Sequence, residues 1–469
     1  VVPPPRPPRP PPPPGRAPPR RPVPPTATAP AAAPGAELLA RRRRTTELGL
    51  LILAVLIISG AYALASLGRN ASLPANIWPF LAAVLLLLVG AHVANRKLAP
   101  AADSLLLPVA ALLNGIGYVF IARLDDELAA LQASWTAVGI AAFVATLVIV
   151  RDVRWLQRYR YTFGLAGVLL LVMPLLPGIG RNINGARIWV SVGPVSFQPG
   201  EFAKIALAIF FAGYLVERRE LLGVATFRVG PFNTPDPKHF GPILLAWGAS
   251  LVVMIFERDL GSALLFFLLF VVMLWVATGR VSYLVVGSVL FVAGAIASWA
   301  AFDHVQERVS VWLDPWADPQ GSGYQIIQAA YAFAWGGTSG VGPGLGIAGR
   351  IPYDETDFIF AVIGEELGLL GATAVLCAFL LLAGSGLRIA RQSTDPFGGL
   401  LAVGLTTLIA FQAFIIMAGV TRLLPLTGVT LPFVSYGGSS LVANYVLLAL
   451  LIRISDQSAQ RGPERLVAR

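Results

Sequence analysis

Long apolar segments, separated by shorter polar ones, run along the chain from residue 47 to residue 454. A helix needs about 20 apolar residues to cross about 30 Å of hydrocarbon. The candidate spans are 47–67, 75–94, 104–121, 134–150, 162–177, 201–216, 240–256, 260–278, 281–302, 358–387, 397–420 and 438–454. Because the bilayer offers the backbone no hydrogen-bonding partner, these segments are predicted to be helices. Since several are short or nearly continuous, we predict an all-α, polytopic integral membrane protein with about 10–12 transmembrane helices.

The distribution of positive charge predicts how these spans are oriented. If the N-terminus is cytoplasmic, the inner segments and the span ends beside them hold 26 of the 35 Lys and Arg, whereas the outer segments hold 8. Cytoplasmic loops of membrane proteins carry such an excess. We therefore expect a multi-pass plasma-membrane protein with both termini in the cytoplasm. One large extracytoplasmic loop, 303–357, precedes the tenth span.

The composition excludes several other classes of protein. Apolar residues make up 56% of the 469 residues, charged residues make up 13%, and the mean hydropathy is +0.71. A soluble domain has about 45–50% apolar and about 25% charged residues, so a water-soluble enzyme of several domains is excluded. The single cysteine, Cys377, excludes disulfides within the chain and thiolate zinc sites. Three separated histidines argue against a histidine metal centre.

The first 44 residues differ in composition from the rest of the chain. They carry nine Arg and one Glu, so +8 of the net +10 charge lies here, and 17 of the 37 prolines fall within residues 1–36. Such a segment cannot form a packed core, and beside a span it suits anionic lipid heads better than nucleic acid. We expect a disordered cytoplasmic tail at 1–44, a transmembrane domain at 45–455 and a cytoplasmic C-terminal tail at 456–469, with no nucleic-acid partner.

The outer loop 303–357 is too long for a simple connection, because structureless loops above about 12–15 residues are uncommon. It contains seven acids and two arginines. Its segment 324–335 has the pattern of an amphipathic helix at the membrane surface, and the glycine-rich stretch that follows offers flexible backbone near a ligand. Gly344, Gly346 and Gly349 form a GxGxxG, but no strand precedes it, so a dinucleotide site is excluded. Neither a P-loop nor an HExxH zinc motif is present.

Charged residues at the membrane boundary are the remaining candidates for chemistry. Asp357 ends the outer loop where a span begins, so it either caps that helix or belongs to a polar site. Glu365 and Glu366 lie two turns further into the same span, where charges are expensive and mark a paired site or a polar pathway. Glu201 and Lys204 are three residues apart on one helical face, which predicts either a structural ion pair or the wall of a polar cavity.

Three further polar residues lie at the outer boundary. Arg187 and Asp259 stand beside apolar helices, and Ser435 belongs to LPFVSYGGSS, which interrupts the hydrophobic pattern as re-entrant backbone around a cavity would. An acidic outer loop with charges near the outer leaflet suits a lipid substrate that has a polar head. A carboxylate could act on that head as a general base. The same charges would also serve a transporter that moves the head across the membrane.

Five segments together resemble the SEDS family of bacterial shape and division proteins, the group of FtsW, RodA and SpoVE. The segments are NGARIWVSVGPVSFQPGEFAK (184–204), ERDLGSALL (257–265), RVSVWLDPWADPQGSGYQIIQA (308–329), TDFIFAVIGEELGLLGA (356–372) and TRLLPLTGVTLPFVSYGGSS (421–440). They occur in the family's order over most of 160–455, and in combination they are highly specific. The chain is most similar in appearance to RodA-type proteins of high-GC Gram-positive bacteria, whose coding bias its arginine-rich composition fits.

This resemblance implies a peptidoglycan glycosyltransferase that polymerises lipid II, an undecaprenyl-pyrophosphate-linked disaccharide peptide, at the outer face of the plasma membrane. The family's essential aspartate, the proposed general base, falls on Asp357. The implied substrate-binding residues are Arg187, Glu201, Lys204, Asp259, Glu365 and Ser435. The resemblance also implies a class B penicillin-binding protein as partner and a divalent cation, Mg or Mn, whose ligands cannot be identified from the sequence. It implies no organic cofactor.

The chain departs from the family where many members read LPExHTDF, because it reads IPYDETDF at 351–358. Tyr353 and Glu355 replace the usual Glu and His, and Asp354 is an additional acid, which leaves open whether Asp354 or Glu355 substitutes for them. Two other functions stay open: a lipid II flippase, and a membrane scaffold of the cell-wall synthesis complex with a docking proline-rich tail. The sequence does not decide between elongation and division, nor does it identify the partner, the metal or the oligomeric state.

Overall fold

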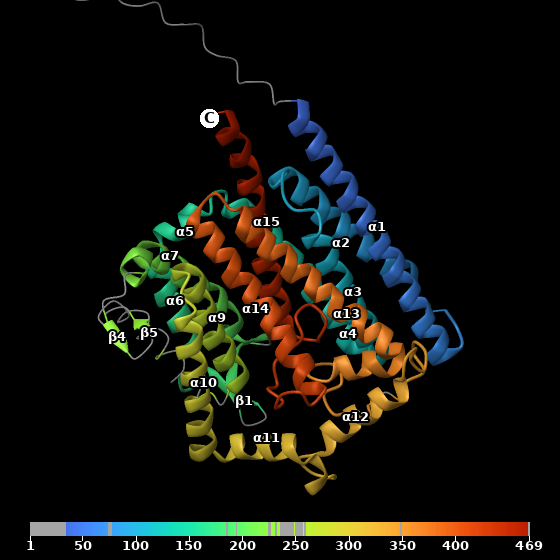
Figure 1. The fold of residues 1–469 in the computed structure, drawn as a ribbon. Helices are drawn as coiled ribbons and strands as arrows, with labels where there is room; N and C mark the ends of the chain where they lie inside the picture. The colour runs from blue at the N-terminus through green and yellow to red at the C-terminus, as the bar shows by residue number, and fades with distance from the viewer. Residues whose placement is uncertain are drawn as a thin grey trace, which may run out of the picture.

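The structure of this chain is a computed structural model. It describes residues 34–73, 77–183, 186–193, 195–223, 227–229, 232–234, 248, 257, 259–347 and 349–467. Figure 1 shows long helices packed side by side, with the first described helix and the last one extending from the same end of the bundle. This end is the cytoplasmic side of the predicted topology.

Ten of the described helices are long and apolar enough to cross a membrane. They are α1 (Pro34–Asn70), α2 (Ile77–Leu98), α3 (Leu106–Leu124), α4 (Asp126–Ile149), α7 (Pro199–Gly223), α9 (Leu260–Thr278), α10 (Ser282–Ala301), α13 (Ile359–Gln392), α14 (Pro396–Val420) and α15 (Gly438–Val467). A helix satisfies its backbone hydrogen bonds internally, as the membrane interior requires. α13 departs from this at Gly368, where it is kinked and where Leu369 and Leu370 donate to the carbonyls of Gly337 and Thr338 instead. The predicted all-α, polytopic membrane fold is confirmed.

Two of the twelve candidate spans are not among these ten helices. The span 162–177 corresponds to α6 (Arg160–Val172), which is followed by the 3-10 helix η1 (Met173–Leu175) and is shorter than the others. Pro174 in η1 lacks a backbone N–H and prevents α6 from continuing. The span 240–256 lies outside the described residues except for position 248. α13 is the tenth span, as predicted, if α6 and the segment 240–256 are both counted as spans.

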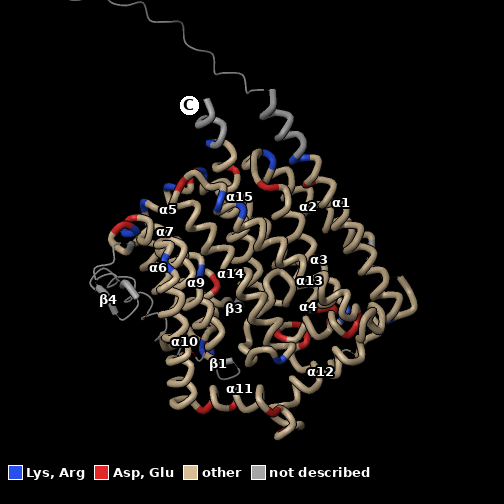
Figure 2. The backbone as a smooth tube through the Cα atoms, viewed as in Figure 1, with Lys and Arg blue, Asp and Glu red and all other residues tan. Residues whose placement is uncertain are grey.

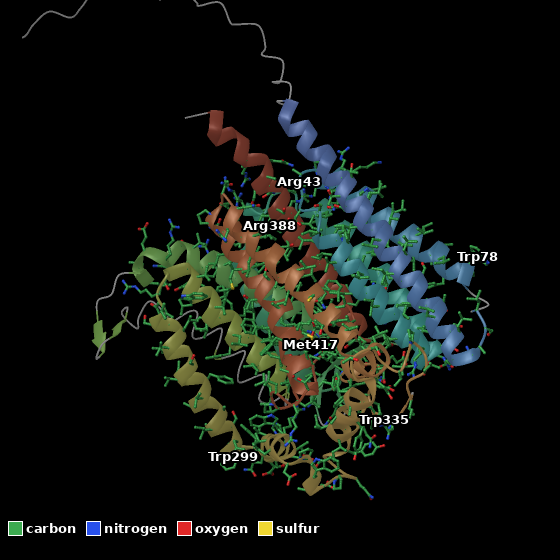
Figure 3. The ribbon with its side chains drawn as sticks, turned by 45° about the vertical axis from the view of Figure 1, so that its right-hand side comes forward. Arg43, Trp78, Trp299, Trp335, Arg388 and Met417 are labelled. Carbon is green, nitrogen blue, oxygen red and sulfur yellow. The ribbon has the colours of Figure 1, made fainter. Side chains whose placement is uncertain are left out.

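The two ends of the bundle differ in charge. Figure 2 shows most Lys and Arg near the end that carries both termini, whereas Asp and Glu predominate along α11 (Asp303–Leu313) at the opposite end. Arg43 and Arg388 lie toward the first end in Figure 3, and Trp299 and Trp335 lie at the other. Basic residues at the inner surface and tryptophans at an interface are the expected pattern. The distribution supports the predicted orientation.

The outer loop folds across the end of the bundle as a series of short elements. After α11 come η3 (Pro315–Ala317) and α12 (Tyr324–Gly336), and the chain then turns back into α13. The bounds of α12 confirm the amphipathic helix predicted at 324–335. The loop is therefore ordered structure at the outer surface, beside the ends of α9 and α14.

Small antiparallel sheets interrupt the helical architecture, and the hydrophobic pattern did not predict them. On the outer side, β1 (Gly180–Ile183), β2 (Ala186–Val192) and β3 (Val195–Phe197) form a three-stranded sheet in sequence order. Its register places Arg181 opposite Trp189 and Ser191 opposite Ser196. β4 (Phe227–Val229) pairs with β5 (Phe232–Thr234) after α7. These strands are shorter than a span and satisfy their backbone groups by pairing.

Helix extends into both predicted tails. α1 begins at Pro34, so the predicted disordered tail is helical from 34 to 44, because AELLARRRR consists of good helix formers that continue into a span. Residues 1–33 lie outside the described residues. At the other end, α15 continues to Val467, so the predicted C-terminal tail at 456–469 is helical up to that residue.

Three helices form the buried centre that supports the outer site. α14 is apolar on all sides, as expected for a helix surrounded by protein, and α7 and the first part of α15 are similarly buried. α10 is almost entirely exposed, as expected for a helix that faces lipid. The outer ends of α7, α14 and α15 are therefore fixed relative to one another by packing.

Candidate active site at the outer face

Asp357 lies in the turn that leads into α13. Phe358 precedes the first turn of this helix, and no side chain there accepts a hydrogen bond from the first-turn amides. The structure therefore does not support the capping alternative for Asp357. Its side chain is partly buried instead, among outer segments that are distant in the sequence.

Two of these segments bring Arg308 and Gly428 to Asp357. A side-chain carbon on Gly428 would lie 3.6 Å from Asp357 Oδ2 and 3.8 Å from a terminal nitrogen of Arg308. Arg308, on α11, donates a hydrogen bond of 2.9 Å to the carbonyl of Leu426. Gly428 has a φ of +71°, a conformation that residues with a side chain rarely adopt. An acid, a cation and exposed backbone therefore meet at one point.

The surroundings of Asp357 suit a general base. Burial raises the pKa of its carboxyl to about 6. The positive charge of Arg308 lowers this pKa, whereas the negative charges of Glu355 and Asp259 raise it. A base with a pKa just below neutral is mostly ionised at pH 7 and still accepts a proton more readily than an ordinary carboxylate.

The two acids that replace or join the usual family residues have different environments. Asp354 is buried, and its Oδ2 accepts the N–H of Gly349 at 2.9 Å. Glu355 is partly exposed, and its main-chain carbonyl accepts the N–H of Tyr436 at 2.9 Å. Burial, together with the nearby Asp354, raises the pKa of the Glu355 carboxyl. Asp354 thus shapes the loop, while Glu355 remains a second acid close enough to influence Asp357.

Ser435 connects the segment after α14 to the turn that carries Asp357. Its hydroxyl donates to the carbonyl of Thr356 at 2.6 Å and accepts the N–H of Leu431 at 2.8 Å. The side chain is buried, so water does not compete for these bonds. Ser435 therefore lies directly beside the candidate base, as a member of its supporting structure.

Asp259 is the N-cap residue of α9. Its Oδ1 accepts the N–H of Ser262 at 3.0 Å, and its Oδ2 accepts the hydroxyl of the same serine at 2.6 Å. Its charge also contributes to the raised pKa of Asp357. The beginning of α9 therefore forms one edge of the acidic site, while the Asp259 carboxylate is used for capping.

Glu201 and Lys204 form the ion pair that their spacing predicts. Lys204 Nζ lies 2.8 Å from both Glu201 carboxylate oxygens and 2.9 Å from Gln412 Oε1. Gln412, on α14, donates to the carbonyl of Thr430 at 2.8 Å. These buried groups link α7 and α14 to the connection between α14 and α15, which also contains Ser435. The pair is structural in this arrangement, and its contact with substrate stays a prediction.

Glu365 and Glu366 hold the glycine-rich segment against α13. Glu366 is paired with Arg123 at 2.6 Å and accepts the N–H of Gly344 at 2.7 Å. Glu365 Oε1 accepts the N–H of Ile347 at 3.4 Å. Both glutamates are buried, so the prediction of a paired intramembrane site is confirmed for Glu366. Substrate binding by Glu365 stays a prediction.

Arg187 lies apart from these groups. It is on β2, and one of its guanidinium nitrogens lies 3.5 Å from the carbonyl of Leu176, just after η1. None of its described contacts reaches Asp357. A role for Arg187 in substrate binding therefore also stays a prediction.

The acids of the site do not form a complete metal cage. Within the described ranges, no three His, Cys, Asp or Glu side chains are grouped so that they could hold a metal ion. Mg²⁺ is usually held by one or two carboxylates together with substrate phosphates. Glu355 supplies a carboxylate of this kind near the candidate base, so it fits a cation that is shared with a phosphorylated substrate.

Three residues of these networks were not identified from the sequence. Arg308 lies in a segment that resembles the family, but its proximity to Asp357 depends on how α11 packs. Gln412 and Arg123 are buried polar residues in apolar helices. The cost of burying an isolated polar group in a membrane is the signal that could have identified them.

The sequence pattern of the FtsW, RodA and SpoVE family, described as "Cell cycle protein", matches residues 105–460. The chain is 46% identical over 423 residues to the peptidoglycan glycosyltransferase RodA of Mycobacterium tuberculosis, covering 88% of this chain and 90% of the relative. It is 34% identical to stage V sporulation protein E of Bacillus subtilis, covering 78% and 99%. It is 36% identical to the probable peptidoglycan glycosyltransferase FtsW of Geobacter metallireducens, covering 73% and 86%.

Solved structures agree with this relationship. A chain from a study titled "Structural coordination of polymerization and crosslinking by a peptidoglycan synthase complex" superimposes with a TM-score of 0.64 at 27% identity, covering 76% of this chain and 98% of that one. The rod shape determining protein RodA of Thermus thermophilus superimposes with a TM-score of 0.54 at 25% identity, covering 76% and 97%. The helical arrangement is therefore shared with experimentally determined relatives.

Proposed function

This chain belongs to the FtsW, RodA and SpoVE family of cell cycle proteins, and we propose that its outer-face site joins lipid II units into glycan strands. It is a multi-pass protein of the plasma membrane. The observation that carries the proposal is Asp357, a partly buried carboxylate with a pKa of about 6, held beside Arg308 at the outer surface. Relatives named peptidoglycan glycosyltransferase, at up to 46% identity, support this activity.

The proposed reaction uses Asp357 as the general base. A sugar hydroxyl of one lipid II molecule attacks the anomeric carbon of another, whose undecaprenyl pyrophosphate leaves. Asp357 takes the proton of that hydroxyl while the new glycosidic bond forms and the bond to the pyrophosphate oxygen breaks. Because the site lies at the outer membrane surface, both lipid tails can stay in the bilayer while their head groups react.

Arg308 and Glu355 give the site two further functions. The Arg308 guanidinium helps to keep Asp357 ionised and can form paired hydrogen bonds with pyrophosphate oxygens. Glu355 would hold a divalent cation, Mg or Mn, together with the pyrophosphate. When bound, that cation would neutralise negative charge on the leaving group.

A class B penicillin-binding protein is the partner that fits this activity. Glycan strands need peptide crosslinks, and the reaction proposed for the outer-face site does not form them. The similar chain from a peptidoglycan synthase complex, whose title joins polymerization with crosslinking, supports such a partnership.

The proposal is tested by polymerisation of purified lipid II. Wild-type protein would be compared with Asp357→Asn in the presence of the partner and of Mg²⁺ or Mn²⁺. Glu307→Gln is the matched control, because Glu307 is an exposed acid on α11. We expect polymer from the wild type and from Glu307→Gln, and none from an Asp357→Asn protein that has the thermal stability of the wild type.

Other outcomes would point to different functions. Equal polymer from wild type and Asp357→Asn would remove Asp357 from catalysis and direct attention to Asp354 and Glu355. No polymer from either protein, in a complex whose partner is active, would favour the flippase, whose transport of lipid II would tolerate the asparagine. A scaffold would be indifferent to Asp357→Asn and would lose function when residues 1–36 are deleted.

A further inference from the structure

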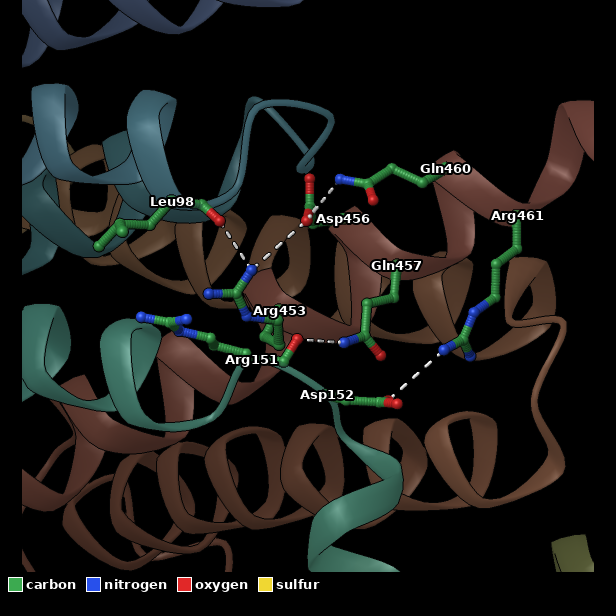
Figure 4. A pocket seen from close by; sticks show the side chains of 8 residues that line it. All are labelled: Leu98, Arg151, Asp152, Arg453, Asp456, Gln457, Gln460 and Arg461. Carbon is green, nitrogen blue, oxygen red and sulfur yellow. Dashed lines mark hydrogen bonds and ion pairs between the residues drawn. The ribbon is translucent and has the colours of Figure 1, made fainter. Parts of the chain in front are cut away.

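A second polar cavity lies at the cytoplasmic end of the bundle, opposite the outer site. Its volume is about 380 Å³, and its lining includes Arg151, Arg453 and Arg461, together with two aspartates and two glutamines. These residues come from α15 and from the connection between α4 and α5 (Arg154–Arg158). Figure 4 shows the three arginines arranged around the cavity. A volume in the range of about 300–1,000 Å³ is typical of small-molecule sites.

Arg453 forms the buried floor of this cavity. Its terminal nitrogens donate to the carbonyls of Leu98, at 2.7 Å, and of Leu147, and the first of them also lies 3.5 Å from the Asp456 carboxylate, as Figure 4 shows. It thereby occupies main-chain acceptors at the inner ends of α2 and α4 that would otherwise repel an anion. The residue is only 6% exposed, yet its Nε has no hydrogen-bond partner among the described residues. A buried donor of this kind requires an acceptor.

Arg151 and Arg461 supply positive charge at the rim. The exposed Arg151 side chain makes no hydrogen bond or ion pair with another described residue, although its main-chain carbonyl accepts from Gln457 at 2.7 Å. Arg461 contacts Asp152 at 3.4 Å in a partly exposed pair. Since exposed pairs contribute little to stability, this arginine can turn to another anion. The three arginines against two aspartates leave the lining with a charge of +1.

We propose that this cavity binds the phosphate group of an anionic phospholipid from the inner leaflet. The inner ends of three membrane-crossing helices surround it, so it lies at the depth of lipid head groups. Trp155 and Tyr159, whose exposed rings are 5.0 Å apart, lie four and eight residues after Arg151. Both residue types are typical of the membrane interface. Basic pockets between transmembrane helices on the cytoplasmic side bind such head groups. The site does not depend on the outer-face chemistry.

Lipid retention by the full-length protein in detergent tests this proposal. Native mass spectrometry would measure the binding of phosphatidylglycerol and of phosphatidylcholine to wild type, Arg151→Gln and Arg461→Gln. Arg158→Gln is the matched control, because Arg158 is an exposed arginine on α5 that does not line the cavity. We expect selective retention of phosphatidylglycerol, about fivefold weaker in each cavity variant and unchanged in the control. Thermal unfolding of the same proteins would also be measured with and without inorganic phosphate.

The remaining outcomes would overturn the assignment. Equal retention by Arg151→Gln, Arg461→Gln and wild type would remove the cavity as the binding site. An equal loss in Arg158→Gln would reduce the effect to general surface charge. Stabilisation by inorganic phosphate that depends on Arg151, without any preference for phosphatidylglycerol, would replace the lipid by a soluble phosphate compound.

Discussion

The hydroxyl of Ser435 donates a 2.6 Å hydrogen bond to the carbonyl of Thr356, the residue immediately before Asp357. The next residue, Tyr436, donates its N–H to the carbonyl of Glu355 at 2.9 Å. Two successive residues of the segment after α14 therefore hold two successive residues of the turn before α13. The position of the candidate base depends on this pairing as well as on the helix that follows.

Replacement of Ser435 by alanine should weaken both the turn and catalysis. It removes the bond to Thr356 and leaves the buried N–H of Leu431 without its acceptor, which costs about 1–3 kcal/mol of folding free energy. A small displacement of the base should lower kcat roughly 10- to 100-fold. Lipid II polymerisation and thermal unfolding would measure the two effects. Ser310→Ala, on the exposed face of α11, should leave both unchanged, and wild-type kcat in Ser435→Ala would contradict the role of this bond.

The pH dependence of polymerisation should report the raised pKa of Asp357. The carboxylate must be ionised to accept a proton, so activity should fall as the pH drops through about 6. An ordinary aspartate would lose activity only near pH 4. The measurement is kcat/KM for lipid II as a function of pH, in which the acidic limb is the fall in activity at low pH. A limb near pH 4 would show that Asp357 is well solvated or is not the base.

Loss of Arg308 should move that limb to higher pH. Its positive charge lowers the pKa of Asp357, so Arg308→Gln should raise this pKa and reduce activity at neutral pH more than at high pH. Arg181→Gln is the control, because Arg181 is an exposed outer arginine on β1. If both variants move the acidic limb equally, the effect belongs to the overall surface charge and not to the position of Arg308 near Asp357.

The pair Glu201 and Lys204 can be tested by removing one charge or both. Lys204→Met leaves a buried carboxylate unpaired and should destabilise the fold by about 3–5 kcal/mol. The double variant Glu201→Leu with Lys204→Met should recover most of that loss, because no unpaired charge remains. Thermal unfolding in detergent would measure this recovery.

Activity of the double variant separates the two interpretations of this pair. If the pair is structural, as the contact of Lys204 with Gln412 indicates, the double variant should polymerise lipid II once its stability is recovered. A stable but inactive double variant would assign Glu201 or Lys204 to the substrate cavity instead.

The sequence by itself determined the membrane architecture and its orientation, and its resemblance to the family pointed to Asp357 as the candidate base. Apolar runs of span length and the positions of Lys and Arg are local features, and the bilayer permits few structures for them. The helix at 324–335 and the ion pair of Glu201 with Lys204 were predictable for the same reason, because helical spacing alone brings their residues together. The short strands of 180–197 were missed, since their pairing depends on contacts between turns that hydrophobicity does not encode.

Only the tertiary structure decided what surrounds Asp357. Arg308 comes from α11, whereas Gly428 and Ser435 both come from the segment between α14 and α15, where Ser435 holds the residue before Asp357. Gln412 reaches Lys204 from α14. Such contacts depend on how helices pack and where loops cross the bundle end, and no spacing along the chain specifies them. The pKa of about 6 at Asp357 has the same origin, because burial and neighbouring charges are properties of the folded site and not of the residue.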